Sequence, residues 1–539
     1  MMLVCILASV FFLQSFLASL LKSPIYDEPF HIAAALSYVE TGRIVVNQQH
    51  PPLIKELSGL FLRAAGVRWP HGAPALEVLL SGPLAEEVGI RIIAENGPDQ
   101  VLFWSRLPLL LLGTAFLFVL YPLARSLVGP GAALGAVFLY AFDPTLLGHT
   151  SVVATDVGIA FFVGAFLLTL WRYLQKPRPM RLGACGLMLG AMLGTKFSGV
   201  LMIPISGALL LAAALWPIGP DPWIPRLAAG PGALHLRRLV GYGIAFLGMG
   251  AIAFAILQYI YLFPANPLQY IDGMRLVNAD HDPTYPFYLA GQLKPHFHSY
   301  FIVAYLLKQP VASIVAAGIG LIVVARDRNI PRLALAFALI PPAALLLGYT
   351  ILSDGLGVRY IAPVLPFTHM LGGVGLVALF HGVARWQQGL GAFLCVWVVV
   401  AAAGIYPDQL SYFNEAACVL DQPGKLGLDG GSRCGSAWLD DSNLDWGQGA
   451  KQLKKWLDRN AGGRPVHVAY FGSFPPSYYG IEIGPTDFAD ALDESKPGLH
   501  VVSAQFLARA RENPGSRAWL LRTEPVAVVG HTFYIYDVR

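Results

Sequence analysis

The sequence predicts an α-helical polytopic membrane protein of about eleven transmembrane helices, followed by a small α/β domain on the extracytoplasmic side. Three observations lead to this prediction. Of the 539 residues, 55% are hydrophobic and only 13% are charged, whereas soluble domains carry roughly a quarter charged residues. Apolar runs of about 20 residues, long enough to cross the hydrocarbon layer as helices, recur along the chain. Basic residues gather at alternate ends of these runs.

The apolar runs give the spans in order, at 2–21, 101–121, 131–147, 152–171, 182–196, 198–216, 239–261, 301–324, 333–352, 361–380 and 389–405. The first run lacks the basic stretch and the small-residue cleavage site of a signal peptide, so we expect it to be retained as a helix. The long loop 22–100 holds no further span. Within it, apolar residues recur at helical spacing over 53–64, which predicts a helix on the membrane surface.

The basic residues set the orientation, because they concentrate on the cytoplasmic side of membrane proteins. With the N-terminus in the cytoplasm, the residues that fall on that side are Arg125, Arg172, Lys176, Arg178, Arg181, Arg226, Arg237, Arg238, Arg326, Arg328, Arg332 and Arg385. An odd number of spans then puts the C-terminus outside, as expected for the inner membrane of a cell. The acidic and histidine-containing clusters at 26–55, 143–156, 278–300 and 353–359 also fall outside, which indicates the face where chemistry occurs.

The composition changes after residue 405. We therefore divide the chain into a transmembrane domain, 1–405, and an extracytoplasmic α/β domain, 406–539, with β-like runs at 466–471, 500–506 and 526–538 and a helix at 448–459. Cys418 and Cys434 lie in this outer domain, where an oxidising compartment permits a disulfide. The formal net charge of +4, without a basic cluster containing aromatics, argues against nucleic acid as a partner.

Two adjacent carboxylates, Asp27 and Glu28, follow the first span. Asp27 suits the N-cap of a helix with Glu28 in its first turn, and spacing alone favours this interpretation. The alternative is a catalytic carboxylate at the membrane surface that takes a proton from an acceptor hydroxyl. Asp156, about one turn inside the fourth span, is a second acidic candidate. A carboxylate in an apolar helix marks either a functional cavity or a position shallow enough to reach water.

Four basic residues on the same side are candidates to hold an anion. His50 and Lys55 flank a stiff Pro-Pro turn, where a surface turn with a solvated lysine is the simpler interpretation. Lys196 ends the fifth span and Arg359 precedes the tenth. Each could extend to the membrane interface or contact a phosphate from within the protein. The guanidinium of Arg359 is a good fork for phosphate oxygens.

The histidines of the segment 262–300 do not indicate a metal site. His281, Asp282, His296 and His298 lack ligand spacing, and solvated or hydrogen-bonded loop histidines are the better interpretation. We therefore assign no metal ligand and no certain cofactor, and leave a requirement for a divalent metal open.

Taken in order, the motifs resemble the GT-C class of membrane glycosyltransferases, and within it the family 39 relatives, protein O-mannosyltransferases and lipid A aminoarabinose transferases. The resemblance covers nearly the whole chain. The motifs that carry it are Asp27-Glu28, His50-Pro-Pro-Leu-x-Lys55, the outer loop ending at Asp156, Thr195-Lys196, Arg359-Tyr360-x-x-Pro363, Tyr288 to Gly291, Tyr305 to Pro310, Tyr412 to Glu415, Asp441 to Gln448, Tyr470 to Gly472 and Tyr478 to Gly480. The chain departs from the lipid A enzymes at His50-Pro51, where they have Lys-Pro, and its outer domain differs from that of the eukaryotic enzymes.

This resemblance implies a GT-C-like fold and a sugar donor on a polyprenyl phosphate, used at the outer membrane face with inversion of the anomeric centre. The acceptor stays open between glycan, lipid and protein. The implied site residues are Asp27, Glu28 and Asp156 for catalysis, and Lys196, Arg359, His50 and Lys55 for the donor phosphate.

Two other classes of protein share many spans and buried charge. A transporter or flippase is expected to show internal repeats and broken helices near the midplane, but the sequence has no visible repeat and its polar residues gather at one face. A non-catalytic scaffold would not need a carboxylate, basic residues and an amphipathic loop on the same side.

Overall fold

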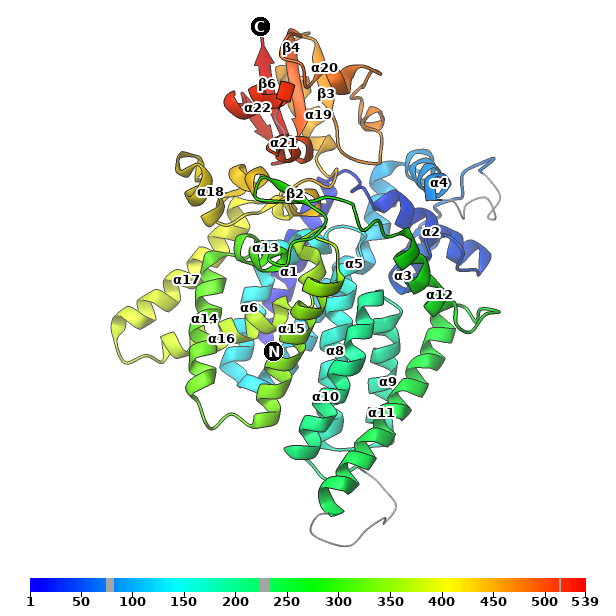
Figure 1. Ribbon diagram of the computed structural model, residues 1–539, viewed down its shortest axis with the longest axis vertical. Helices are drawn as coiled ribbons and strands as arrows, with labels where there is room; N and C mark the ends of the chain where they lie inside the picture. Colours follow the sequence, from blue (N-terminus) through cyan, green and yellow to red (C-terminus); the bar gives the residue numbers. More distant parts are fainter. Residues whose placement is uncertain (74–81, 223–232, 513–514) are drawn as a thin grey trace.

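The computed structural model describes residues 1–73, 82–222, 233–512 and 515–539, so Arg226, one of the basic residues used for orientation, lies outside the described part. Helices make up the membrane part (Figure 1). They are α1 (Met2–Leu20), α5 (Pro98–Val128), α6 (Pro130–Ala141), α7 (Pro144–Thr150), α8 (Asp156–Gln175), α9 (Pro179–Leu193), α10 (Met202–Leu215), α11 (Ala233–Ile260), α13 (Tyr300–Lys308), α14 (Val311–Arg326), α15 (Arg332–Leu352), α16 (Leu365–Phe380) and α17 (Arg385–Gly404).

These helices confirm a polytopic membrane protein. Within the described residues, seven helices are long and apolar enough to cross a membrane, and two bent pairs, α6 with α7 and α13 with α14, bring the number to nine. The predicted spans 182–196 and 361–380 correspond to the shorter apolar helices α9 and α16. Each of the eleven predicted runs therefore coincides with a helix or a bent pair.

The bends occur at prolines. Helices α13 and α14 meet at 112°, and the junction is Gln309-Pro310, where Gln309 is extended. A proline disfavours helical geometry in the residue before it, so the chain turns sharply at this point. Helices α6 and α7 break at Asp143-Pro144 with an angle of 59°, and the Asp143 carboxylate caps α7 by accepting the Leu146 N–H at 3.1 Å.

Short helices cover one end of the bundle. They are α2 (Glu28–Thr41), α3 (Leu53–Ala64), α4 (Gly82–Glu95) and α12 (Gln269–Asp280). Helix α3 packs closely on α2, because a Cβ at Gly59 would lie only 2.2 Å from the Ala35 carbonyl oxygen. Its buried face includes Ile54 and Leu62, whereas Leu60 faces outward, as expected for a helix at the membrane surface.

The C-terminal part contains a four-stranded sheet in the order β3-β4-β6-β5. Strand β3 (Val466–Ala469) runs parallel to β4 (Gly498–Ser503), and β6 (Phe533–Val538) pairs antiparallel with both β4 and β5 (Ala527–Val529). Helices α19 (Ala450–Asn460), α20 (Asp487–Asp490), α21 (Ala504–Ala510) and α22 (Ala518–Arg522) accompany the strands. The predicted α/β composition is confirmed, and Figure 1 shows this sheet at the end of the molecule opposite the α14–α15 connection.

A second small element, α18 (Ala416–Asp421), precedes the sheet. Cys418, in α18, forms a disulfide with Cys434, with their Cα atoms 5.1 Å apart. This separation is inside the limit of about 7 Å for a disulfide, so the predicted pairing is confirmed. The β1–β2 hairpin (Phe287–Leu289 and Gln292–Lys294) lies near this region, and the Ala290 N–H donates to the Trp438 carbonyl.

Candidate active site

Four of the residues singled out in the sequence lie together. Asp27 precedes α2, Asp156 begins α8, Lys196 follows α9, and Arg359 lies in a 3-10 turn (Val358–Ile361) between α15 and α16. Nη1 of Arg359 lies 3.2 Å from Oδ2 of Asp27 and 4.0 Å from Oδ2 of Asp156. Nζ of Lys196 donates to Oδ1 of Asp156 at 2.6 Å. Four distant segments thus join in one chain of alternating charges, although the chemical roles of these residues remain predictions.

Asp27 does not act as a helix cap. It occupies the N-cap position of α2, but its side chain makes no capping hydrogen bond. The carboxylate turns instead to Arg359 and is 29% exposed. The capping interpretation favoured by the spacing is therefore wrong. What remains at this position is a partly accessible carboxylate held by one contact.

The guanidinium of Arg359 has one edge without a partner in the described structure. Nη1 contacts Asp27, whereas Nε is buried and makes no hydrogen bond. The ring of Trp446 lies 4.0 Å from the guanidinium carbon and holds it by a cation–π contact. Burial opposes the charge, but Asp27 and Asp156 outweigh burial and raise the pKa of Arg359. A fixed, charged fork with a free edge can bind an anion.

Lys196 turns inward. Its ammonium bonds to the fully buried Asp156 and lies 4.3 Å from the centre of the Tyr360 ring. A snorkelling lysine would place its charged end in water, so this geometry argues against that interpretation. Asp156 is only 1% exposed, and its pairing with Lys196 fixes the position of the ammonium.

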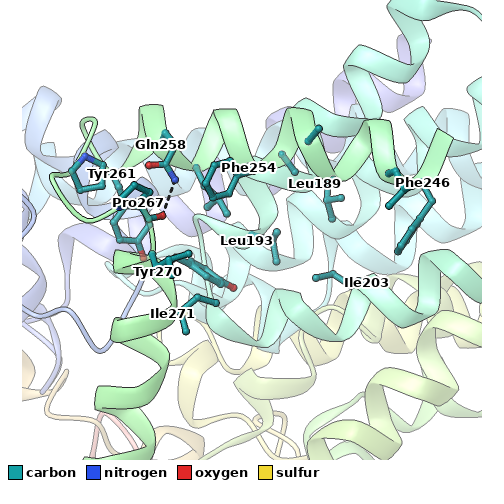
Figure 2. Close-up of a pocket in the computed structure, with 17 residues that line it drawn as sticks. Leu189, Leu193, Ile203, Phe246, Phe254, Gln258, Tyr261, Pro267, Tyr270 and Ile271 are labelled. Carbon is teal, nitrogen blue, oxygen red and sulfur yellow. Dashed lines mark hydrogen bonds between the residues drawn. The ribbon is translucent and has the colours of Figure 1, made fainter. Parts of the chain in front are cut away.

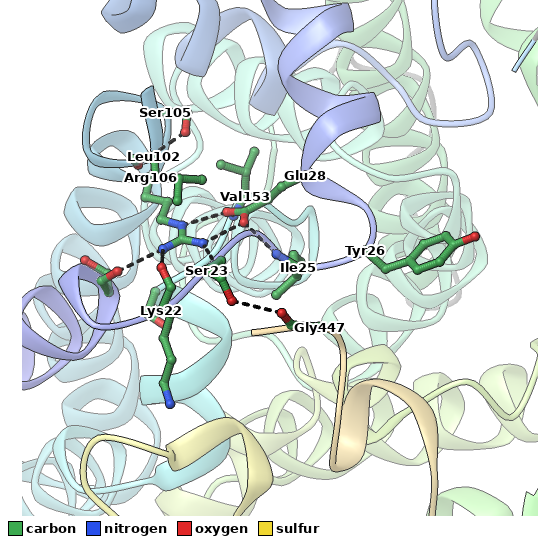
Figure 3. A network of polar contacts seen from close by, with 12 residues as sticks. Lys22, Ser23, Ile25, Tyr26, Glu28, Leu102, Ser105, Arg106, Val153 and Gly447 are labelled. Atoms are coloured by element: carbon green, nitrogen blue, oxygen red, sulfur yellow. Dashed lines mark hydrogen bonds and ion pairs between the residues drawn. The ribbon is translucent and has the colours of Figure 1, made fainter. Parts of the chain in front are cut away.

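Glu28 points toward Arg106 (Figure 3). Its two oxygens accept from Nε and Nη2 of Arg106 at 2.7 and 2.6 Å, and from the N–H groups of Val153 and Ile25 at 2.8 and 2.9 Å. Arg106 also donates to the Ser23 carbonyl at 2.9 Å. With no exposed surface and no free lone pair, Glu28 fits a structural role, which corrects the expectation that it is a catalytic candidate.

Lys55 and His50 also differ from the expectation. Nζ of Lys55 is buried and donates to the carbonyls of Asn47 and His50 at 2.7 and 2.8 Å, so it organises this turn and is not free to bind phosphate. The ring of His50 lies 5.3 Å from that of His31. Burial, with His31 and Lys55, holds the pKa of His50 well below its usual range, and burial lowers the pKa of His31 to about 4. His50 is therefore a neutral hydrogen-bonding group at pH 7.

The segment 440–448, from the C-terminal part, forms one wall of the site. The Tyr26 N–H donates to the Trp446 carbonyl at 2.7 Å, next to Asp27. Oδ1 of Asn443 accepts the Val358 N–H at 2.8 Å, next to Arg359. The family motif Asp441 to Gln448 covers this segment, but a contact across so many residues leaves no local signal in the sequence that would assign it to the site.

An apolar groove lies among α9, α11 and α12 (Figure 2). It has a volume of about 450 Å³, and its lining residues include Leu189, Leu193, Phe254 and Ile271. Tyr270, which also lines it, packs edge-on against Phe197, with the ring centres 5.2 Å apart. Because Phe197 directly follows Lys196, one end of the groove lies beside the charged cluster.

The charged cluster does not have the form of a metal site. Asp27 and Asp156 each pair with a cation, and therefore do not converge as two uncommitted carboxylates. Elsewhere in the described residues, His467, Asp487 and Asp490 bring potential ligand atoms within 4.8 Å of one another in the sheet domain.

Residues 98–224 match the family model described as dolichyl-phosphate-mannose-protein mannosyltransferase. No curated protein matches the sequence. Among solved structures, ArnT from Cupriavidus metallidurans in the apo state aligns with a TM-score of 0.48 and 15% identity, over 99% of this chain and 97% of that one. The oligosaccharyltransferase AglB from Archaeoglobus fulgidus, in complex with an inhibitory peptide and a dolichol-phosphate, aligns with a TM-score of 0.41 and 11% identity, over 98% and 74% of the two chains. The Pmt1-Pmt2 complex of S. cerevisiae aligns with a TM-score of 0.31 and 15% identity, over 53% and 39%. The family match, which covers α5 to α10, thus confirms the resemblance to membrane glycosyltransferases that the sequence motifs predicted.

Proposed function

We propose that this protein transfers a sugar from a polyprenyl-phosphate donor to an acceptor hydroxyl at the extracytoplasmic membrane face, with inversion of the anomeric centre. The observation that supports this function best is the free edge of the Arg359 guanidinium beside Asp27. A base and an anion-binding group thereby lie within reach of one substrate. Asp27, Arg359 and Lys196 are the residues we propose to act on it.

The apolar groove supports a lipid-linked donor. Removing a long isoprenoid chain from the bilayer costs about 0.8 kcal/mol per CH₂, so the enzyme must meet its donor within the membrane. The groove is apolar and ends beside Lys196, so a lipid tail in it would place its phosphate near the two cations.

The chemistry is a single displacement at the anomeric carbon. The acceptor oxygen forms the new bond to this carbon while the bond to the phosphate oxygen breaks, and the hydroxyl proton passes to Asp27. Negative charge develops on the leaving phosphate, where the free edge of Arg359 and the ammonium of Lys196 stabilise it. Attack opposite the leaving group inverts the configuration. Asp156 orients Lys196, Trp446 holds Arg359, and His50 offers a neutral hydrogen bond nearby.

For the location, we propose a multi-pass protein of the inner membrane with residues 1–405 forming the transmembrane domain and 406–539 lying outside the cytoplasm. The distribution of basic residues supports this orientation. A reporter that is active only in the cytoplasm, fused after residue 539, is expected to be silent, and an active fusion would contradict the orientation.

The deciding experiment separates transfer from transport, since a flippase for a lipid-linked sugar is the alternative. Purified protein in liposomes is supplied with radiolabelled polyprenyl-phosphate sugars and a range of hydroxyl acceptors. Appearance of label on an acceptor, lost in Asp27→Asn, supports the transferase. Movement of intact donor between leaflets without any transfer, equal in the wild type and in Asp27→Asn, would favour the flippase.

A further inference from the structure

The disulfide-closed segment from α18 to Cys434 exposes an apolar surface. Val419 is 54% exposed, Leu420 is 67% exposed and Leu428 is 79% exposed, and Leu426 is also exposed. Folded proteins do not usually leave several large apolar residues of one short segment in water. The Cys418–Cys434 disulfide ties together the two ends of the segment that presents them.

This segment lies alongside the end of a transmembrane helix. The Trp397 indole N–H donates to the carboxylate of Glu415, at the start of α18, at 2.6 Å. Trp397 precedes the end of α17 at Gly404 by seven residues, which is about 10 Å along a helix. This contact ties the N-cap of α18 to the last two turns of α17, and Figure 1 shows α18 next to that end of the helix.

The apolar surface also continues that of the span. Val396 and Val400, one turn apart on α17, are exposed and face the lipid. At the end of the helix, a Cβ on Gly404 would lie 1.9 Å from the Leu428 carbonyl oxygen, so the segment is packed directly on the helix end. The exposed side chains of the segment therefore lie next to the end of the apolar span α17.

A polar pocket opens behind this surface. It has a volume of about 730 Å³ and is lined by Gly404 and Leu428 together with the basic residues Lys425, Arg433 and His531 and the acidic residues Asp429 and Glu524. Nε of Arg433 donates a hydrogen bond to Asp429 at 3.0 Å, and the rest of its guanidinium makes no hydrogen bond to the described residues. Lys425 pairs with the exposed Glu524 at 3.0 Å. The pocket therefore presents cations at the depth of lipid head groups.

From these contacts we infer that residues 416–434 dock on the outer leaflet of the bilayer and that the adjacent pocket binds the phosphate of an anionic phospholipid. The apolar side chains enter the acyl region, and Lys425 and Arg433 face the phosphodiester. This contact anchors the outer part of the chain next to the last span. It is independent of the sugar-transfer chemistry, because none of these residues belongs to the charged cluster around Arg359.

Spin labels on the full-length protein in phospholipid vesicles test the docking. With the free cysteines Cys5, Cys185 and Cys395 replaced by alanine, a label is placed at Leu428→Cys. A matched control label is placed at Phe488→Cys, an exposed apolar position on α20 in the sheet domain. The Leu428 label should be accessible to oxygen and shielded from a water-soluble nickel complex, and the control should show the reverse. A Leu428 label that is open to nickel, or shielded from both reagents by a second protein surface, overturns the proposal.

The head-group assignment is tested by the lipid that the purified protein retains. After reconstitution in mixed phosphatidylcholine and phosphatidylglycerol, the wild type should retain phosphatidylglycerol preferentially. Lys425→Gln should lower this preference by about fivefold, whereas Lys455→Gln, which removes an exposed cation from α19, should not change it. An equal preference in wild type and Lys425→Gln, or equal losses in both variants, overturns the assignment, and Arg433→Gln provides a second removal of charge from the same pocket.

Discussion

Asp27→Asn should lower turnover by several orders of magnitude, on the order of 10² to 10⁴, and leave the fold intact. Asparagine keeps the size of the side chain and can still accept a hydrogen bond from Arg359, but it cannot take a proton. Loss of a general base typically lowers a rate by about 10² to 10⁴, which corresponds to roughly 3 to 5 kcal/mol of transition-state stabilisation. Asp27 makes one partly exposed ion pair and no cap, so its replacement should cost less than about 1 kcal/mol of folding free energy.

The neighbouring residue provides a control with the opposite outcome. Glu28 is fully buried and accepts four hydrogen bonds, two of them from Arg106. Glu28→Gln leaves the Arg106 guanidinium buried without a counter-charge, and breaking such a pair costs about 3–5 kcal/mol. The two substitutions should therefore have different effects: Asp27→Asn should lower turnover, and Glu28→Gln should lower stability.

Both variants are assayed for thermal unfolding in detergent, for donor affinity and for single-turnover transfer from a radiolabelled polyprenyl-phosphate sugar. Donor affinity should survive in Asp27→Asn, because the proposed phosphate contacts lie on Arg359 and Lys196. Near-normal transfer by a folded Asp27→Asn protein would refute Asp27 as the base, and Asp156 would then be the residue to test. A stable Glu28→Gln protein would refute the structural role assigned to Glu28.

Two further predictions concern the site wall and the outer part of the chain. Arg359→Lys keeps the charge but loses the planar guanidinium and its stacking on Trp446, so the donor KM should rise about tenfold. An unchanged KM would show that Arg359 does not bind the donor phosphate. Trp446→Phe keeps an aromatic ring against Arg359, so it should change the donor KM only slightly. Burial lowers the pKa of His531, but hydrogen bonds to Asp408 and Asp429 outweigh burial and leave the pKa raised. The contribution of His531 to the free energy of unfolding should therefore be complete below about pH 6.5. It should be lost as the pH rises through the folded-state pKa, and the free energy of unfolding should fall by at most about 1.4 kcal/mol per pH unit. Thermal unfolding measured against pH should show this loss in the wild type and not in His531→Gln.

The membrane part of the fold was predictable because the bilayer imposes length and composition on every span. The site was partly predictable for the same reason, since charges such as Asp156 and Lys196 stand out in apolar helices. Arg106 carried the same signal inside the second span and could have been found by it. Its partner Glu28 would then have been recognised as structural.

Other features required the tertiary structure. The N-cap preference describes which residue types suit a position. It does not indicate that the Asp27 side chain contacts Arg359, 332 residues away along the chain, and makes no capping hydrogen bond. Trp446 stacks on Arg359, but the sequence around a tryptophan in an outer segment does not indicate which residue it contacts. Contacts of this kind depend on how segments meet, which the periodicity of the sequence does not encode.

The surroundings of Arg106 bear on how the protein is assembled during synthesis. A guanidinium within a span is costly in lipid until it is neutralised. Its partners, the carboxylate of Glu28 and the carbonyls of Ser19 and Ser23, all precede it in the chain, and so have left the ribosome before α5 reaches the membrane. The counter-charge of the second span is therefore synthesised before the span itself, and we expect insertion of α5 to depend on α1 remaining beside it.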